Sequence, residues 1–136
     1  MDISELSDTQ SESAVIGTLI SHPEFIEHSD FLQPNHFHDF NNCCMYWAIR
    51  ELHNDGIDNM DAYNVSSKLQ SRNDLQRNLE QYNMPSMEEQ IRLYHYSARD
   101  SLEEYKMMLK LCDILVYINF HHLHIMHNKH LNYFLK

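Results

Sequence analysis

The stretch SARDSLEEYKMMLKLCDILVYINF, residues 97–120, decides the fold that we expect. Ser101 and Glu104 have the spacing of a helix-capping box, and no Gly or Pro follows them in the sequence. Apolar residues then recur at alternating steps of three and four, namely at Leu102, Tyr105, Leu109, Cys112 and Val116. This spacing predicts a long helix with an apolar stripe along one side.

Further apolar side chains lie outside this stripe. A helix with two apolar sides cannot bury both of them against one small domain. We therefore expect the long helix to be an association element that contacts another helix or another subunit, with packing inside the chain's own core as the alternative. The residues expected at the oligomer or partner interface are Leu102, Tyr105, Met108, Leu109, Cys112, Leu115 and Val116.

Length and composition favour one helical domain. The chain has 136 residues, of which 43% are hydrophobic, and only two glycines and three prolines. Few residues are therefore available for tight β-turns. We predict an all-α fold in which a compact bundle of about six short helices, residues 1–96, precedes a long helix or helical hairpin. That second part, residues 97–136, ends in a histidine-rich tail.

Six helical segments are indicated before residue 97, and their signals begin at Ser7, Pro23, Asn41, Asp61, Asp74 and Ser86. Gly56 is expected to end the third helix in a left-handed conformation. Gly17 lies inside the first helix. It either costs about 1 kcal/mol relative to Ala or allows a close contact with another helix.

The charge distribution argues against a nucleic-acid ligand. The net charge is −10, and residues 1–113 carry 8 basic and 20 acidic residues, or −12. Phosphate binding releases counterions only where Lys and Arg cluster, so direct binding of nucleic acid is not expected. A protein partner with a basic face is compatible with this charge.

Several segments resemble the N-terminal domain of replicative hexameric DNA helicases, the DnaB family. SESAVIGTLI, residues 11–20, is similar to that family's first helix, E-x-A-V-L-G-x-L-L, and His22-Pro23-Glu24 is similar to its D-P-E motif. The same order continues with Leu32-Gln33-Pro34 up to Phe37, the helix Asn41 to Leu52, the series Asp61, Val65 and Leu69, and the series Ser101, Leu102 and Tyr105. The resemblance covers about residues 11–112.

The resemblance implies a scaffold rather than a catalyst. In that family a helical body carries a helical hairpin, and hairpins pair between subunits to build a collar of dimers. The collar contacts primase and, in some systems, the helicase loader. ATP and magnesium belong to a separate motor domain, so no cofactor is expected in this chain. The three cysteines, Cys43, Cys44 and Cys112, are an odd number and do not form a disulfide framework, so reduced thiols in a cytoplasmic protein are expected. No membrane segment is expected, because the longest apolar run is short.

Enzymatic motifs are weak in this sequence. A nucleotide-hydrolysing motor needs the P-loop G-x-x-x-x-G-K-[ST], and neither Gly17 nor Gly56 belongs to one. His36, His38 and Asp39 lie close together but have no nucleophile motif beside them, so we interpret them as loop residues. We therefore expect no catalytic residue in this chain.

The histidines of the tail suggest a different function. His121, His124, His127 and His130 are spaced by three, and such pairs share a helix face. The last three are candidate metal ligands, although no Cys or carboxylate after Asp113 completes a local site, and no metal is predicted. Their protonation below about pH 6.5 is a linked hypothesis of a pH response.

Three functions remain open from the sequence. The first is an assembly and protein-docking domain of a replicative helicase, which forms a dimer or a higher oligomer. The second is a stand-alone relative that binds and modulates a helicase, a loader or a primase. The third is an unrelated helical protein that uses its C-terminal histidines to respond to a metal or to pH. We favour the first, because six similar segments occur in the right order.

Overall fold

The computed structural model describes residues 9–29, 31–112 and 134. Every regular element within these ranges is helical, which confirms the predicted all-α fold. A helix also occupies residues 102–112. The labelled elements, of which η1 and η2 are 3₁₀-helices, are α2 (Thr9–Ser21), η1 (Pro23–His28), η2 (Pro34–His36), α3 (Phe40–Asn54), α4 (Ala62–Gln70), α5 (Asn73–Leu79) and α6 (Met87–His95).

Helix ends lie where local side-chain chemistry predicts them. The hydroxyl groups of Ser86 and Ser101 each accept a hydrogen bond from the backbone N–H three residues further on, at 3.2 and 3.1 Å. Gly56 follows α3 with a φ of +82°, which confirms the left-handed cap. The chain then turns so that the Ile57 N–H donates to the Leu52 carbonyl group at 2.8 Å.

The second helix is short. It begins at Pro23, as its sequence signal predicts, and η1 ends at His28. The Ser29 hydroxyl group donates to the Ile26 carbonyl group at 2.8 Å. Such a local side-chain bond competes with the helical backbone pattern and favours a turn. Leu32 is nevertheless buried, whereas Phe31 is exposed.

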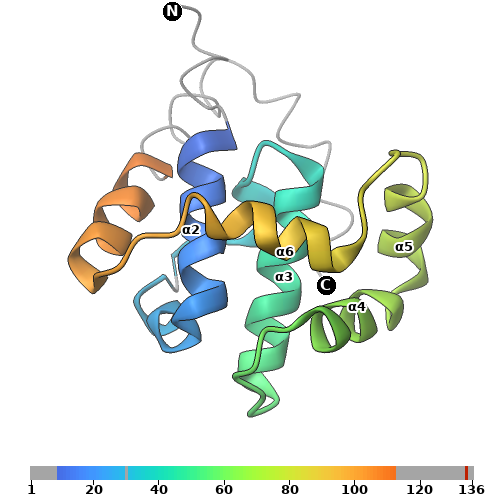
Figure 1. Cartoon of the computed structure of the whole chain (residues 1–136), viewed down its shortest axis with the longest axis horizontal. Helices are drawn as coiled ribbons and strands as arrows, with labels where there is room; N and C mark the ends of the chain where they lie inside the picture. The colour runs from blue at the N-terminus through green and yellow to red at the C-terminus, as the bar shows by residue number, and fades with distance from the viewer. Residues whose placement is uncertain (1–8, 30, 113–133, 135–136) are drawn as a thin grey trace, which may run out of the picture.

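The helices are arranged around a central pair (Figure 1). α2 and α3 stand side by side, and α6 crosses in front of both of them. α4 and α5 lie along one edge of the molecule, and the helix at 102–112 lies at the opposite edge. This arrangement leaves one long side of α6 facing outward.

Gly17 makes the crossing of α2 and α6 possible. A Cβ atom at this position would lie 2.2 Å from the Tyr94 carbonyl oxygen, far inside van der Waals contact. The neighbouring Thr18 hydroxyl group accepts a hydrogen bond from the Arg99 backbone N–H at 2.8 Å, and so fixes the chain as it leaves α6. The second interpretation of Gly17, a close helix contact, is therefore confirmed.

One core runs through the molecule and includes the helix at 102–112. Tyr105, Leu109 and Cys112 are buried in the same apolar cluster as the central helices. The predicted boundary after residue 96 divides the sequence into two parts. The buried side chains of both parts belong to one core. Trp47, which the sequence places in the core, is only partly buried, and the Arg72 guanidinium group lies 5.2 Å from its ring centroid.

Candidate docking surfaces

The inner face of helix 102–112 is held on the body by packing and by one buried hydrogen bond. The Tyr105 hydroxyl group donates to Oγ of Ser29 at 3.1 Å. The Tyr105 ring centroid lies 5.7 Å from that of Phe25 on η1. Leu109 and Cys112 continue the same buried stripe. Three of the seven residues predicted at an interface are therefore covered by their own chain.

For these three residues the structure shows the alternative, packing inside the chain's own core. The spacing predicts the apolar stripe correctly. Periodicity alone, however, does not show whether that stripe is covered by the same chain or by another chain. Leu102 and Met108 lie at the edges of the stripe and are partly buried. Leu115 and Val116 lie outside the described residues, so the prediction for them stays a prediction.

The outer face of helix 102–112, which we define as Met107 and Leu111, carries exposed apolar surface. Met107 is 59% exposed and Leu111 is 41% exposed. These two residues are four positions apart, so their side chains neighbour each other on one side of the helix. An exposed apolar pair on a helix whose other side is already buried is a candidate association surface.

The candidate metal ligands His124, His127 and His130 lie outside the described residues. Within the part of the chain that is described, no group of three metal-ligating side chains occurs. Cys43, Cys44 and Cys112 are buried, and burial raises the pKa of the Cys43 and Cys44 thiols well above their usual value. These two thiols of α3 therefore stay protonated at neutral pH and are poor metal ligands.

His36, His38 and Asp39, which precede α3, each make a local structural contact. Nδ1 of His36 accepts a hydrogen bond from the Gln33 backbone N–H at 3.1 Å, which closes η2. Oδ2 of Asp39 accepts from the Asn42 backbone N–H at 3.0 Å, and so caps α3. His38 is exposed and offers its backbone N–H to a buried carboxylate. This geometry agrees with their interpretation as loop residues.

That buried carboxylate belongs to Glu12, which sequence analysis missed. Its oxygens accept hydrogen bonds from the backbone N–H groups of His38 (2.6 Å) and Asp39 (3.3 Å) and from Nδ2 of Asn42 (3.0 Å). Burial raises the pKa of Glu12 from 4.5 to about 7, and the three hydrogen bonds oppose this rise. A usable signal was present, since Glu12 lies four positions before the buried Ile16.

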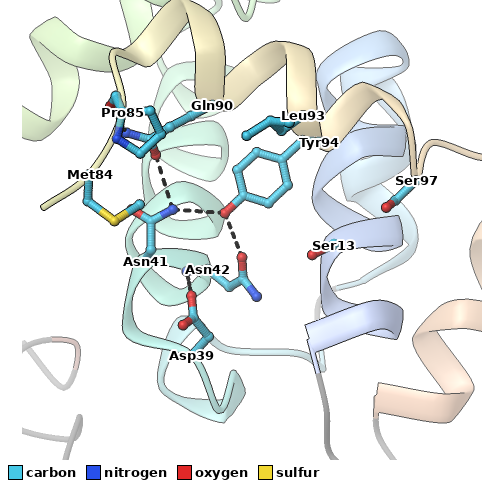
Figure 2. A pocket seen from close by; sticks show the side chains of 10 residues that line it. All are labelled: Ser13, Asp39, Asn41, Asn42, Met84, Pro85, Gln90, Leu93, Tyr94 and Ser97. Atoms are coloured by element: carbon cyan, nitrogen blue, oxygen red, sulfur yellow. Dashed lines mark hydrogen bonds between the residues drawn. The ribbon is translucent and has the colours of Figure 1, made fainter. Parts of the chain in front are cut away.

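A chain of side-chain hydrogen bonds extends from this carboxylate across three helices (Figure 2). The Tyr94 hydroxyl group donates to Oδ1 of Asn42 at 2.5 Å and accepts from Nδ2 of Asn41 at 3.0 Å. The same Asn41 amide donates to Oε1 of Gln90 at 3.1 Å. Nε2 of Gln90 finally donates to the Pro85 carbonyl group at 2.9 Å. The network fixes α6 and the segment before it on α2 and α3.

A cleft of 340 Å³ opens beside this network. Tyr94 and Asn41 form part of its wall, and the apolar side chains of Met84 and Leu93 lie around its mouth (Figure 2). Met84 and Leu93 are both exposed. Of the described residues that line the cleft, Asp39 is the charged one. The cleft therefore combines an ordered polar wall, an apolar rim and one carboxylate.

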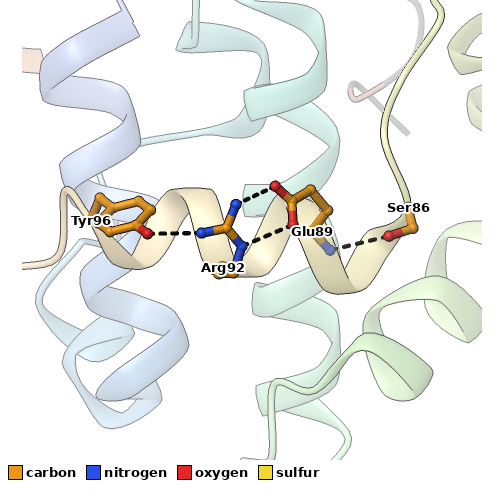
Figure 3. A network of polar contacts seen from close by, with 4 residues as sticks. All are labelled: Ser86, Glu89, Arg92 and Tyr96. Carbon is orange, nitrogen blue, oxygen red and sulfur yellow. Dashed lines mark hydrogen bonds and ion pairs between the residues drawn. The ribbon is translucent and has the colours of Figure 1, made fainter.

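The outer side of α6 carries a rigid polar cluster (Figure 3). The Arg92 guanidinium group donates to both carboxylate oxygens of Glu89, and this hydrogen bonding lowers the pKa of Glu89. Its remaining nitrogen, Nη1, donates to the Tyr96 hydroxyl group at 2.7 Å. Arg92 is therefore engaged within α6 and its C-terminal turn.

Comparison with known proteins identifies the family. Residues 4–98 match the sequence profile of the DnaB-like helicase N-terminal domain. The chain belongs to this family. No curated protein and no solved structure matches the chain. The matched residues contain α2 to α6, so the DnaB-like domain includes Glu12, Gly17 and the cleft beside α6, whereas helix 102–112 follows the matched range.

The DnaB-like domain presents no helix, among its described elements, with the length and hydropathy that a bilayer crossing requires. Two surfaces of the described structure are candidates for protein contact, namely the outer face of helix 102–112 and the cleft beside α6.

Proposed function

We propose that this chain is a non-catalytic assembly and protein-docking domain of a replicative DNA helicase. The observation that carries the proposal is the family match over residues 4–98. Two exposed apolar surfaces, the outer face of helix 102–112 and the rim of the cleft beside α6, support it, because both are suited to contact protein. ATP hydrolysis and DNA translocation are then tasks of a separate motor domain, which would hold ATP and magnesium.

Self-association uses the outer face of helix 102–112 in this proposal. Its inner stripe is already buried against the body, so Met107 and Leu111 offer the apolar surface that a second copy can cover. Leu115 and Val116 would extend the same helix, as the sequence predicts. The expected product is a dimer or a higher oligomer that forms a collar.

The external partners in this proposal are the primase and the helicase loader, and the domain acts in the cytoplasm. The net charge of −10 favours a partner with a basic face and disfavours direct contact with nucleic acid. The domain itself carries no catalytic residue in this proposal. Its contribution is to hold proteins together at the replication fork.

The test is a binding titration on the intact chain. Purified chain is titrated by calorimetry with the primase and with the helicase loader from the same organism, and separately with single-stranded DNA. The proposal predicts saturable binding of at least one protein, no binding of DNA at physiological salt, and no ATP hydrolysis. Binding of DNA alone, or ATP turnover by the pure chain, would contradict it.

A further inference from the structure

A second pocket lies directly beside the cleft at α6. It has a volume of 270 Å³ and is lined by residues of α4 and α5 together with the segment before α6. The two pockets share Asn41, Met84, Pro85 and Gln90 in their linings. They therefore form adjacent compartments that share the Met84–Pro85 segment. We call the pair the α6 groove.

The charged residues that are described in the lining of the α6 groove are acidic. Asp39 lines the first compartment and Glu80 lines the second. Among the described residues, neither compartment is lined by Lys or Arg, and Arg92 on α6 is already bonded to Glu89. The whole chain carries a net charge of −10. A cationic segment is therefore attracted to this groove, whereas a nucleic-acid phosphate or an acidic peptide is repelled.

Apolar surface separates the two carboxylates. Met84 belongs to both compartments, and Leu93 lies at the mouth of the first. Tyr82 lines the second compartment and is also exposed. An apolar side chain of a bound segment can contact these groups while its charged neighbours reach the carboxylates on either side. The pattern that fits is basic, apolar, basic.

The groove is ordered before any partner binds. Asn41 is held by Gln90 and by the Tyr94 hydroxyl group, and Gln90 in turn holds the Pro85 carbonyl group at 2.9 Å. Asp39 is fixed as the N-cap of α3 through its Oδ2 atom. Binding therefore requires little additional ordering of the groove, which reduces the entropic cost of association.

We propose that the α6 groove binds an extended segment of a protein partner in which Lys or Arg residues flank an apolar residue. The basic side chains pair with Asp39 and Glu80, and the apolar side chain packs on Met84 and Leu93. This inference rests on the proposed docking function and adds to it the place of docking and the chemistry of the partner.

The probe for this proposal is a phage-displayed library of random peptides selected on the intact chain. The most enriched peptide is then synthesised with a fluorescent label, and its affinity is measured by anisotropy. We expect enrichment of Lys or Arg around an apolar residue. Raised salt should weaken binding, because the charge pairs are near the surface.

Matched variants locate the binding site. Asp39→Asn with Glu80→Gln removes both charges, and Asn preserves the helix cap at position 39. Glu24→Gln with Asp100→Asn removes the same charge from residues that line neither compartment. We expect the first pair to weaken the peptide by about tenfold or more, and the second pair to leave its affinity unchanged. Leu93→Ser should also weaken it.

Three outcomes would overturn the proposal. These are the absence of enriched peptides, enrichment of peptides without basic residues, and equal binding by the groove and control variants. Solution mass is recorded for every variant, and the groove variants should keep the mass of the intact chain. Loss of peptide binding by a groove variant whose mass is unchanged thus reports on the groove. An intact chain that is monomeric but still binds the peptide contradicts only the assembly claim.

Discussion

The two faces of helix 102–112 differ in what covers them. The inner face, with Tyr105 and Leu109, is closed by the chain's own body. The outer face, with Met107 and Leu111, is apolar and exposed. One side of this short helix is therefore buried in the fold, and the other side remains available for assembly. An apolar residue of this helix therefore contributes to folding if it lies on the inner face, and it is available for association if it lies on the outer face.

Buried seams and exposed faces should respond to substitution in opposite ways. A substitution in a buried contact lowers the free energy of unfolding, and it affects association only through this loss of stability. A change on an exposed face leaves stability nearly constant and alters association directly. The predictions below separate these two responses.

Leu109→Ala should have the largest effect. Leu109 is 1% exposed, so its truncation removes buried apolar surface and leaves a cavity in the core. We expect the free energy of unfolding to fall by about 2–5 kcal/mol in urea titrations followed by circular dichroism. Leu111→Ala is the matched control, two positions away on the exposed side, and should change it by about 0.5 kcal/mol or less. Equal losses would show that the two faces are not distinct.

Glu12→Gln should change how stability depends on pH. The native pKa of about 7 exceeds the ordinary value of 4.5. Between these values the folded chain holds a proton that the unfolded chain has released, so this group makes stability fall as pH rises from about 4.5 to 7. The full change corresponds to roughly 3 kcal/mol.

Urea titrations at several pH values between 4.5 and 8 measure this dependence. The difference between the intact chain and Glu12→Gln isolates the carboxyl group from the histidines, which also titrate in this range. We expect the variant to lose stability less steeply with rising pH. Parallel profiles for the two proteins would mean that Glu12 is ionised throughout.

Gly17→Ala should disturb the crossing of α2 and α6. The added Cβ atom would meet the Tyr94 carbonyl oxygen at 2.2 Å, so α6 must move away. Overpacking of this kind costs about 1–3 kcal/mol, although Ala favours a helix more than Gly does. Thermal unfolding measures the change. A gain in stability would show that the two helices separate without cost.

Tyr105→Phe should have a smaller effect within the same inner face. It preserves the ring that packs near Phe25 and removes the hydroxyl group that donates to Ser29. We expect a loss of about 0.5–1.5 kcal/mol in urea titrations. A loss as large as that of Leu109→Ala would mean that the hydrogen bond, rather than packing, holds this helix.

Local signals made most of the fold predictable from the sequence. The caps at Ser86 and Ser101 and the left-handed Gly56 all depend on residues near each other in the chain. These features require no knowledge of the tertiary arrangement. For Gly17 the sequence left two interpretations open, and the contact with Tyr94 decides between them. The order of the helices then led to the family that the sequence profile confirms.

The sites depended on distant contacts and were less predictable. The partners of Glu12 are 26 to 30 residues away, so its spacing from Ile16 indicates the side of the helix but not the groups that hold its carboxylate. Likewise, the stripe through Leu109 indicates burial but not which surface provides it. The groove beside α6 arises only when α6 is placed across α3, which no local pattern specifies.

The most direct test of the assembly claim is solution mass by light scattering. The intact chain is compared with Met107→Glu plus Leu111→Glu, and with Tyr63→Glu on α4, where the aromatic side chain is 78% exposed. We predict an oligomer for the intact chain and for Tyr63→Glu, and a folded monomer for the double variant. An intact chain that is monomeric, or a double variant that keeps the oligomer mass, would contradict the claim.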